Sequence, residues 1–393
     1  MAMGGDAETS RPAQPDPSRP SYLELFFDLA YVFALIALSR VLLDELTWVG
    51  LGQILVLLLA FTLIWALSAW VGDRLDLTRP SVAPLIIGIM AGSLLMAGAV
   101  PEAYGDRGLL FTVTYLSIHY GAGVYVALFV GGAGVGLSSS RTLLWESAAA
   151  VPWITGAVLT TGATRAGLWA VALVVEYVGV VLGWPAPWSW RRLPRPPRPI
   201  GERIAERYRQ FVIIALGSSL FLVGSSFSAG PYTTARSGAL VVVFLITVLI
   251  WRIYIYRAGE LMTGTISTSA NPERLSQVAA FVHLILVAGI VGTGVGSQLV
   301  IDRPFGDTPP SWAVAILGGP AVFLIGRALL DYTVFAHVNR ARLIGLLLLA
   351  GLAAATSLLP PIMVALAVMG ILAYIATSNL IQTLVKPLDP VTR

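Results

Sequence analysis

The sequence predicts an all-α integral membrane protein with about 12 transmembrane helices, arranged as two six-helix halves in a parallel repeat. Three observations lead to this fold class. Of the 393 residues, 56% are hydrophobic and only 12% are charged, whereas soluble domains are about one quarter charged. The apolar stretches come as two sets of six, and nearly all the basic residues lie in alternate gaps between them.

Each apolar stretch is long enough to cross a bilayer. Roughly 20 apolar residues match the ~30 Å hydrocarbon core. Because backbone polar groups must be satisfied inside the segment at that depth, each stretch is expected to be helical. The last two are separated only by Leu358-Leu359-Pro360-Pro361. The expected spans are residues 24–43, 49–71, 82–100, 108–130, 142–162, 166–184, 206–228, 236–256, 276–299, 311–330, 341–358 and 361–385.

The basic residues predict the orientation of the chain. Of the 25 Lys and Arg residues, 20 fall on the side of the N-terminal tail, and the other five are Arg40, Arg107, Arg165, Arg236 and Arg303. Because positive charge stays in the cytoplasm during insertion, we expect both termini to be cytoplasmic. The net charge of +4 then predicts contact with anionic lipid headgroups at the Arg-rich side rather than with nucleic acid.

A segment rich in proline and arginine divides the chain. Proline forbids helix there and favours an extended conformation. The N-terminal tail, with four prolines among Gly, Ser and charged residues, is too polar to fold. The expected organisation is a disordered cytoplasmic tail at 1–20, a first six-helix half at 21–184, a cytoplasmic linker at 185–203, a second half at 204–386 and a cytoplasmic tail at 387–393.

The two halves resemble each other weakly. Glu24 opens the first span as Glu206 opens the seventh, and Trp70 near the end of the second span matches Trp251 near the end of the eighth. Because a six-helix unit crosses the membrane an even number of times, two copies share one orientation, as in many secondary transporters. Chance similarity between two apolar sequences is the alternative. Further matches are Gly88, Gly92 and Gly98 in the third span with Gly289, Gly292 and Gly296 in the ninth, and these glycines are also expected to allow close helix packing.

Residues 23–34, LELFFDLAYVFA, strongly resemble the opening motif of the bacterial low temperature requirement protein A family. Residues 70–76 resemble the family segment after the second helix, and residues 96–105 the end of the third. Residues 205–208 and 211–217 resemble its seventh. The resemblance implies a bacterial cytoplasmic-membrane protein linked by name to growth in the cold. The family name supplies no molecular activity.

The chain departs from the family pattern at three positions. Ser218 stands where members usually carry an acid, Arg203 where they often carry a histidine, and Gln298 where an acid is common near the end of the ninth span. His283 in that span matches the family. Proton or cation chemistry that relied on the missing acids would be weakened, so the pattern suggests a specialised or less active member.

Ionisable residues inside the spans are the candidate functional residues, because a charge at bilayer depth costs several kcal/mol. Glu24 and Asp28 are four residues apart and share one helix face, which suits proton exchange or cation binding. The alternative is a pair of interfacial acids at a helix N-terminus. Glu176 is the deepest acid, with His119 and His283 as possible partners. A membrane histidine is alternatively a neutral group that joins helices.

A smaller group, Asp73, Arg74 and Asp76, is expected to anchor a cytoplasmic loop, with gating as the second interpretation. The chain has no cysteine, and its three histidines show no metal-ligand spacing. We therefore expect no metal and no cofactor.

Three classes of function remain open. The layout of six plus six spans and the buried acids favour a secondary transporter or channel for an unknown small molecule or ion. A membrane-embedded enzyme acting on a lipid or isoprenoid is the second class, since paired carboxylates supply general acid chemistry, although an enzyme is the less favoured interpretation. A non-catalytic membrane scaffold is the third.

Overall fold

The structure, a computed structural model, describes residues 21–75, 79–130, 140–186, 202–256, 269 and 272–385, without the side chains of 202–204, 272–273 and 382–385. This part of the chain is built from helices and contains no β-strand. The helices of the first half are α1 (Tyr22–Asp44), α2 (Trp48–Arg74), α3 (Ala83–Ala99), η1 (Val100–Glu102), α4 (Gly108–Tyr125), η2 (Val126–Val130), α5 (Ser140–Leu159) and α6 (Gly162–Leu182). Those of the second half are α7 (Glu202–Ala229), α8 (Thr234–Tyr254), α10 (Pro272–Asp302), α11 (Pro310–Phe335), α12 (Arg340–Ala353), η4 (Thr356–Leu358) and α13 (Pro361–Val385).

In the described part of the chain, 11 helical segments are long and apolar enough to cross a membrane. The expected span at 341–358 is the exception. There α12 has only 14 residues and is followed by the short η4, so the apolar stretch is not one continuous helix. The next helix, α13, begins at Pro361, where the sequence placed the boundary, because proline is tolerated in a first helical turn. The predicted all-α membrane fold is confirmed.

Local signals explain where several helices begin and end. Ser21 and Glu24 form a capping box at the start of α1: the Ser21 hydroxyl accepts from the Glu24 N–H at 3.2 Å, and the Ser21 N–H donates to Glu24 Oε2 at 2.8 Å. At the starts of α2 and α8, the hydroxyls of Thr47 and Thr233 accept from the backbone N–H groups of Gly50 and Arg236. Gly183, in the left-handed conformation, ends α6.

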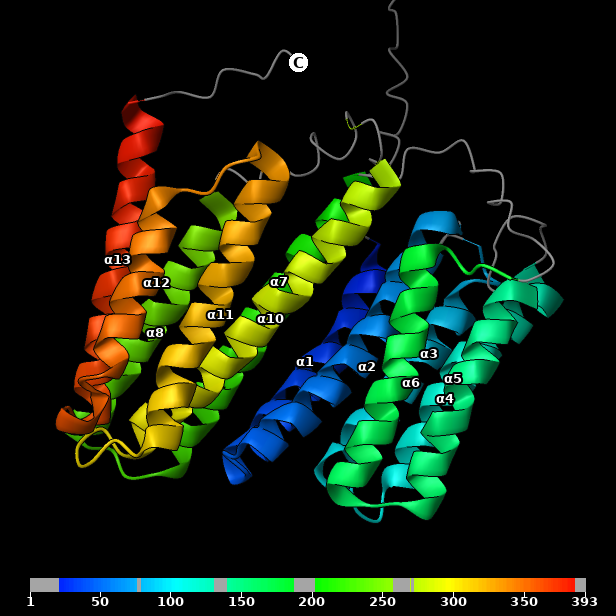
Figure 1. Cartoon of the computed structure of the whole chain (residues 1–393), viewed down its shortest axis with the longest axis horizontal. Helices are drawn as coiled ribbons and strands as arrows, with labels where there is room; N and C mark the ends of the chain where they lie inside the picture. Colours follow the sequence, from blue (N-terminus) through cyan, green and yellow to red (C-terminus); the bar gives the residue numbers. More distant parts are fainter. Residues whose placement is uncertain are drawn as a thin grey trace, which may run out of the picture.

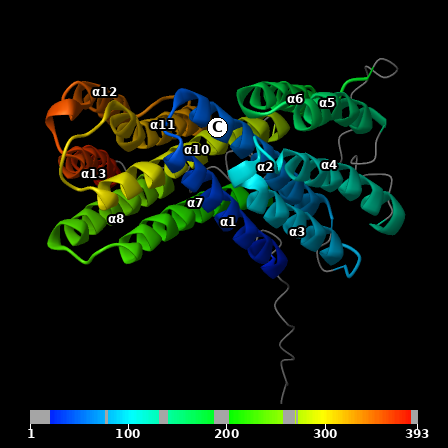
Figure 2. The ribbon, with the colours of Figure 1, turned by 90° about the horizontal axis from the view of Figure 1, so that it is seen from below.

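The two groups of helices lie side by side (Figure 1), with α1 to α6 on one side and α7 to α13 on the other. Seen from below (Figure 2), α1, α2, α7 and α10 lie between the two outer groups, and α1 packs against both α7 and α10. The centre of this junction is aromatic. Trp65 of α2 stacks on Phe211 of α7 with ring centroids 4.4 Å apart, and Tyr31 of α1 meets the edge of Phe211 at 6.2 Å.

Corresponding helices of the two halves pack in corresponding pairs. In the first half these pairs are α1–α3, α3–α4, α4–α5, α5–α6 and α2–α6, and in the second half α7–α10, α10–α11, α11–α12, α12–α13 and α8–α13. On this matching pattern, together with the sequence similarity, we propose that the halves are a parallel repeat.

Glycines bring α10 and α11 into close contact. A Cβ added at Gly296 would lie 2.7 Å from both the Ala315 carbonyl oxygen and Ile316 Cα, and one added at Gly292 would lie 3.1 Å from Gly319 Cα. The expectation of close packing in the ninth span is therefore correct. In the third span it is wrong for Gly88 and Gly98, where an added Cβ would meet no atom within 4 Å. An added Cβ at Gly92 would lie 2.7 Å from the Ile118 side chain and 3.7 Å from Thr114 Cγ2, so this glycine does lie against α4.

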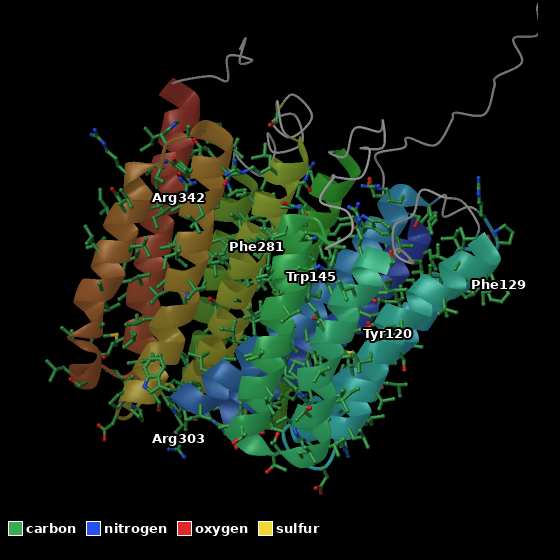
Figure 3. All side chains as sticks on the ribbon, turned by 45° about the vertical axis from the view of Figure 1, so that its right-hand side comes forward. Tyr120, Phe129, Trp145, Phe281, Arg303 and Arg342 are labelled. Carbon is green, nitrogen blue, oxygen red and sulfur yellow. The ribbon has the colours of Figure 1, made fainter. Side chains whose placement is uncertain are left out.

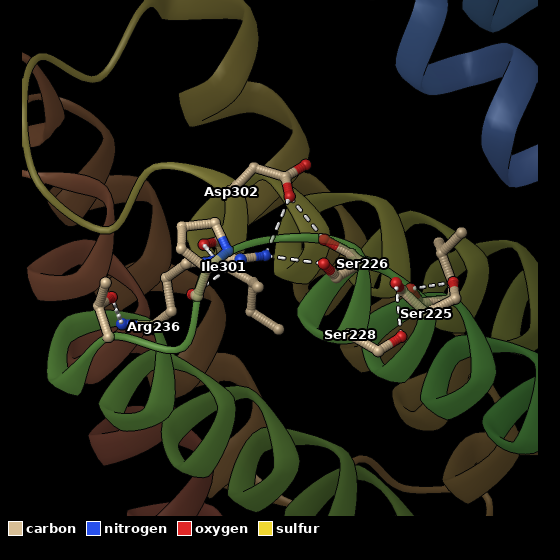
Figure 4. A network of polar contacts seen from close by, with 9 residues as sticks. Ser225, Ser226, Ser228, Arg236, Ile301 and Asp302 are labelled. Atoms are coloured by element: carbon tan, nitrogen blue, oxygen red, sulfur yellow. Dashed lines mark hydrogen bonds and ion pairs between the residues drawn. The ribbon is translucent and has the colours of Figure 1, made fainter.

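Two buried arginines donate hydrogen bonds to carbonyl oxygens at helix ends, on the side of the molecule to which the sequence assigned few basic residues. Arg236 of α8 donates to the carbonyl oxygens of Ser226 at 2.7 Å and Ile301 at 3.1 Å, and Ser226 donates to Asp302 at 2.5 Å (Figure 4). Arg165 of α6 donates likewise to several carbonyls, including that of Ala103 at 2.9 Å. The last carbonyls of a helix have no partner inside the helix, so both arginines act as structural caps.

Candidate functional site

Three ionisable residues meet where the two halves join, and we call them the α1–α7 charge cluster: Glu24, Asp28 and Arg207. The Arg207 Nη1 atom donates to Asp28 Oδ2 at 2.9 Å, and its Nε atom lies 3.9 Å from Glu24 Oε1. The guanidinium also lies over the Trp65 ring, 5.4 Å from its centroid. All three side chains are buried, with Arg207 only 1% exposed. The structure therefore brings the two predicted acids together and adds a cation between them.

The partner of these acids, Arg207, was not among the predicted site residues. It stands in the family-like stretch at 205–208 and within an expected span, so the rule that flags charges at membrane depth applies to it as well. A buried cation requires a paired anion. Sequence alone did not show that the anion comes from a helix 179 positions away.

A second group, the α4–α5–α6 cluster, consists of Tyr115, His119, Glu146, Trp153 and Glu176. Glu176, 4% exposed, accepts from the Tyr115 hydroxyl at 2.5 Å and from the Trp153 indole N–H at 3.2 Å. His119 Nδ1 lies 3.9 Å from Glu146 Oε1, and the His119 ring packs on Tyr115 with centroids 4.6 Å apart. The structure thus places His119, one of its two expected partners, beside Glu176.

Glu146 is the member of this cluster that sequence reasoning missed. It lies near the start of an expected span, where an acid is usually interfacial, yet its side chain is only 8% exposed. Its Oε2 atom and His119 Nε2 have no hydrogen-bond partner among the described residues. Nearby, the Tyr120 hydroxyl of α4 donates to Ser147 Oγ of α5 at 3.2 Å, and Figure 3 shows Tyr120 partway along the helical segment that ends near Phe129.

His283 lies in a different environment, away from Glu176. Its Nδ1 lies 2.7 Å from the Ala279 carbonyl oxygen, its Nε2 lies 3.1 Å from the Tyr254 hydroxyl, and its ring stacks on Tyr208 at 5.0 Å. An N–H at Nδ1 and an acceptor at Nε2 satisfy both contacts with a neutral ring. This geometry favours the interpretation of His283 as a group that joins α7, α8 and α10.

A third charged group in the described structure, Arg327, Asp331 and Arg342, was also not predicted. Asp331 pairs with Arg327 on its own helix and with Arg342 at the start of α12. Arg327 also donates to the Ile253 carbonyl at 2.9 Å. The group lies on α11 and α12, which correspond to α4 and α5 in the proposed repeat, but it is dominated by cations rather than acids.

The predicted loop group is only partly described. Arg74 Nε lies 3.6 Å from Asp73 Oδ2, and its guanidinium lies over Trp70 at 5.4 Å from the centroid. Asp76 and the side chain of Arg203 lie outside the described residues.

The other two departures from the family pattern fall on described positions. Ser218 is buried and donates to the Ala215 carbonyl of its own helix at 2.8 Å. Gln298 Oε1 is buried without a hydrogen-bond partner among the described residues.

The fold and these buried polar clusters define a polytopic α-helical membrane protein. The chain matches the family described as bacterial low temperature requirement A protein over residues 19–377, and it belongs to that family. It is 34% identical over 321 residues to a protein of Rhizobium meliloti (strain 1021) named "Uncharacterized protein RA0937", covering 80% of this chain and 78% of that protein. No solved structure was found to match the chain.

Proposed function

We propose that this protein is a secondary transporter or channel of the bacterial cytoplasmic membrane, in which buried carboxylates couple movement of a small solute or ion to protons or cations. The observation that carries the proposal is the α4–α5–α6 cluster. It holds two carboxylates and an imidazole within the membrane-spanning helices, and no Lys or Arg side chain in the described structure forms an ion pair with Glu146 or Glu176.

Electrostatics explains why such a cluster suits proton coupling. Two carboxylates without a cation are costly at low dielectric, so the group is stable only when protons neutralise part of its charge. Because the imidazole and the carboxylates lie close together, a proton gained or lost by one of them changes the charge that its neighbours meet. The proton-accepting atoms Glu146 Oε2 and His119 Nε2 have no described protein partner that competes for them.

The arrangement of the halves supports alternating access. In parallel-repeat transporters the halves move against each other around a site at their interface, and here the α1–α7 charge cluster lies at that interface.

We also propose that both termini are cytoplasmic. In support, Arg342 and Arg303, assigned to opposite sides by charge, lie at opposite ends of the molecule in Figure 3.

The test is proton flux in proteoliposomes with an enclosed pH dye, under imposed gradients of H⁺, Na⁺ and K⁺. We expect Glu176→Gln to abolish pH-dependent flux, because an amide keeps the shape of the carboxylate but does not titrate. His119→Gln should lower the flux strongly. His283→Gln should leave it near the wild-type level, since that ring is held as a neutral group. Glu102→Gln, at an exposed position at the end of η1, is the surface control.

Normal flux in folded Glu176→Gln protein would assign the cluster a structural role and make the scaffold the leading function. Absence of flux from wild-type protein under all three gradients would overturn the proposal outright.

A further inference from the structure

A groove with a volume of about 240 Å³ lies between α1 and α7, along the junction of the two halves. Its walls are mainly apolar, and two wall residues, Leu29 and Ile213, are 63% and 49% exposed. Exposed apolar side chains on membrane-spanning helices face lipid, so the groove opens toward the bilayer. The lining residues are Leu25, Asp28, Leu29, Val32, Glu206, Arg209, Gln210, Ile213 and Ile214.

The groove contains a buried acceptor that the protein only half satisfies. Asp28 lines it and is 4% exposed. Its Oδ2 atom accepts from Arg207 at 2.9 Å, whereas Oδ1 has no hydrogen bond of normal geometry in the described part of the chain. The Trp65 indole also interacts with this carboxylate, but its N–H likewise makes no such bond. An unmade hydrogen bond to a buried charge is costly, so a donor supplied by a ligand would be stabilised there.

The charges around this end of the groove favour a cation. Glu24 and Asp28 share Arg207, and Glu206 pairs with Arg209 at 3.1 Å. Of these groups, Asp28 is the buried carboxylate that lines the groove, and its Oδ1 oxygen still accepts no hydrogen bond of normal geometry among the described residues. A ligand anion would be repelled by this carboxylate, while a ligand cation would donate a charge-assisted hydrogen bond to it.

We propose that the groove between α1 and α7 binds an amphiphilic cation, with its cationic head at Asp28 and its apolar body between Leu29, Val32 and Ile213. An apolar cavity of about 150 Å³ holds a benzene-sized molecule, so 240 Å³ accommodates a larger apolar body. The inference rests on the proposed transport function and names the class of its substrate, which reaches the site from the bilayer.

The test is direct binding to the full-length protein in nanodiscs of zwitterionic lipid, with empty nanodiscs as background. The probes are labelled dodecyltrimethylammonium, dodecyl sulfate and dodecyl maltoside, which share a chain and differ in head charge. We expect saturable binding of the cationic probe alone. Asp28→Asn should weaken it at least about tenfold, as the loss of a charged hydrogen-bond acceptor implies.

Asp28→Asn also removes a carboxylate that pairs with Arg207, so a loss of binding could come from a disturbed junction. Two further variants test the groove without changing any charge. Ile213→Trp fills the groove without changing any charge and should abolish binding. Leu220→Trp, two helical turns further along the exposed face of α7 but outside the groove, should bind normally.

Equal binding of the three probes would identify an ordinary acyl-chain groove and overturn the proposal, as would normal binding by Ile213→Trp. Because this assay needs no flux, its failure leaves the test of Glu176→Gln intact. If the protein binds the cationic probe but shows no flux, the proposed binding site stands and only the proposed transport function is ruled out.

Discussion

At the scale of single residues, the stability of the junction depends on how the buried charge of Arg207 is compensated. The residue lies on α7, is 1% exposed, and meets two carboxylates of α1 and the ring of Trp65. Removing one partner of a buried ion pair is far more costly than replacing the whole pair, because the remaining charge is left uncompensated. The cluster therefore joins α1 of one half to α7 of the other through buried charges that compensate one another.

We expect Arg207→Gln to lower the free energy of unfolding by about 3–5 kcal/mol, because Asp28 remains buried without its cation. The double variant Arg207→Gln with Asp28→Asn should recover part of this loss. Thermal unfolding in detergent, analysed as a double-mutant cycle, measures the coupling. Arg303→Gln, at an exposed position, serves as the control, and additive effects of the two substitutions would contradict an interaction between the residues.

At the scale of helices, the two halves use different means of packing. Aromatic rings of α1, α2 and α7 fill the junction between the halves, whereas glycines allow the backbones of α10 and α11 to approach closely. In lipid no hydrophobic driving force draws helices together, so close packing of this kind contributes directly to association. Gly319 of α11 faces the backbone of Thr293 so closely that no Cβ fits there.

We expect Gly319→Ala to destabilise the protein by about 1–3 kcal/mol, because the added methyl group forces α10 and α11 apart. Gly98→Ala in α3 is the matched control, since an added Cβ there meets no atom within 4 Å. Unfolding temperatures of both variants in the same detergent give the comparison. Equal stability of the two variants would show that the α10–α11 crossing tolerates a wider separation.

At the scale of the whole molecule, the proposed topology rests on the division of basic residues between the two ends. Arg165 and Arg236, assigned to the poorer side, are buried helix caps rather than exposed charges. Arg207, Arg327 and Arg342, assigned to the richer side, are buried as well, so burial does not reverse the imbalance of positive charge on which the proposed cytoplasmic termini rest.

We expect a reporter fused after Pro199 to be cytoplasmic and one fused after Gly306 to be periplasmic or external, because these points lie on opposite sides in the proposed arrangement. Paired phosphatase and fluorescent-protein fusions measure this. A fusion at the C-terminus, expected to be cytoplasmic, is the internal control. Two cytoplasmic results at Pro199 and Gly306 would refute the assignment of the spans.

Sequence by itself determined the environment of this protein and its helices, except at 341–358, where the expected span is divided into the short α12 and η4. A run of about 20 apolar residues has only one stable form in lipid, because every backbone polar group must be satisfied within the segment. The helices and the boundary at Pro361 follow from this rule and from local caps. The sequence also selected Glu24, Asp28, His119 and Glu176, since charge at membrane depth is visible in the order of residues alone.

Only the tertiary structure decided which of these groups meet. Arg207 joins Asp28 across 179 positions, Glu146 joins His119 from another helix, and His283 lies apart with Tyr254. Partner choice depends on which faces of neighbouring helices touch, and in lipid that depends on shape and small residues rather than on the apolar pattern that marks each helix. The close crossing at Gly292 and Gly319, and the open space at Gly88 and Gly98, were settled by packing for the same reason.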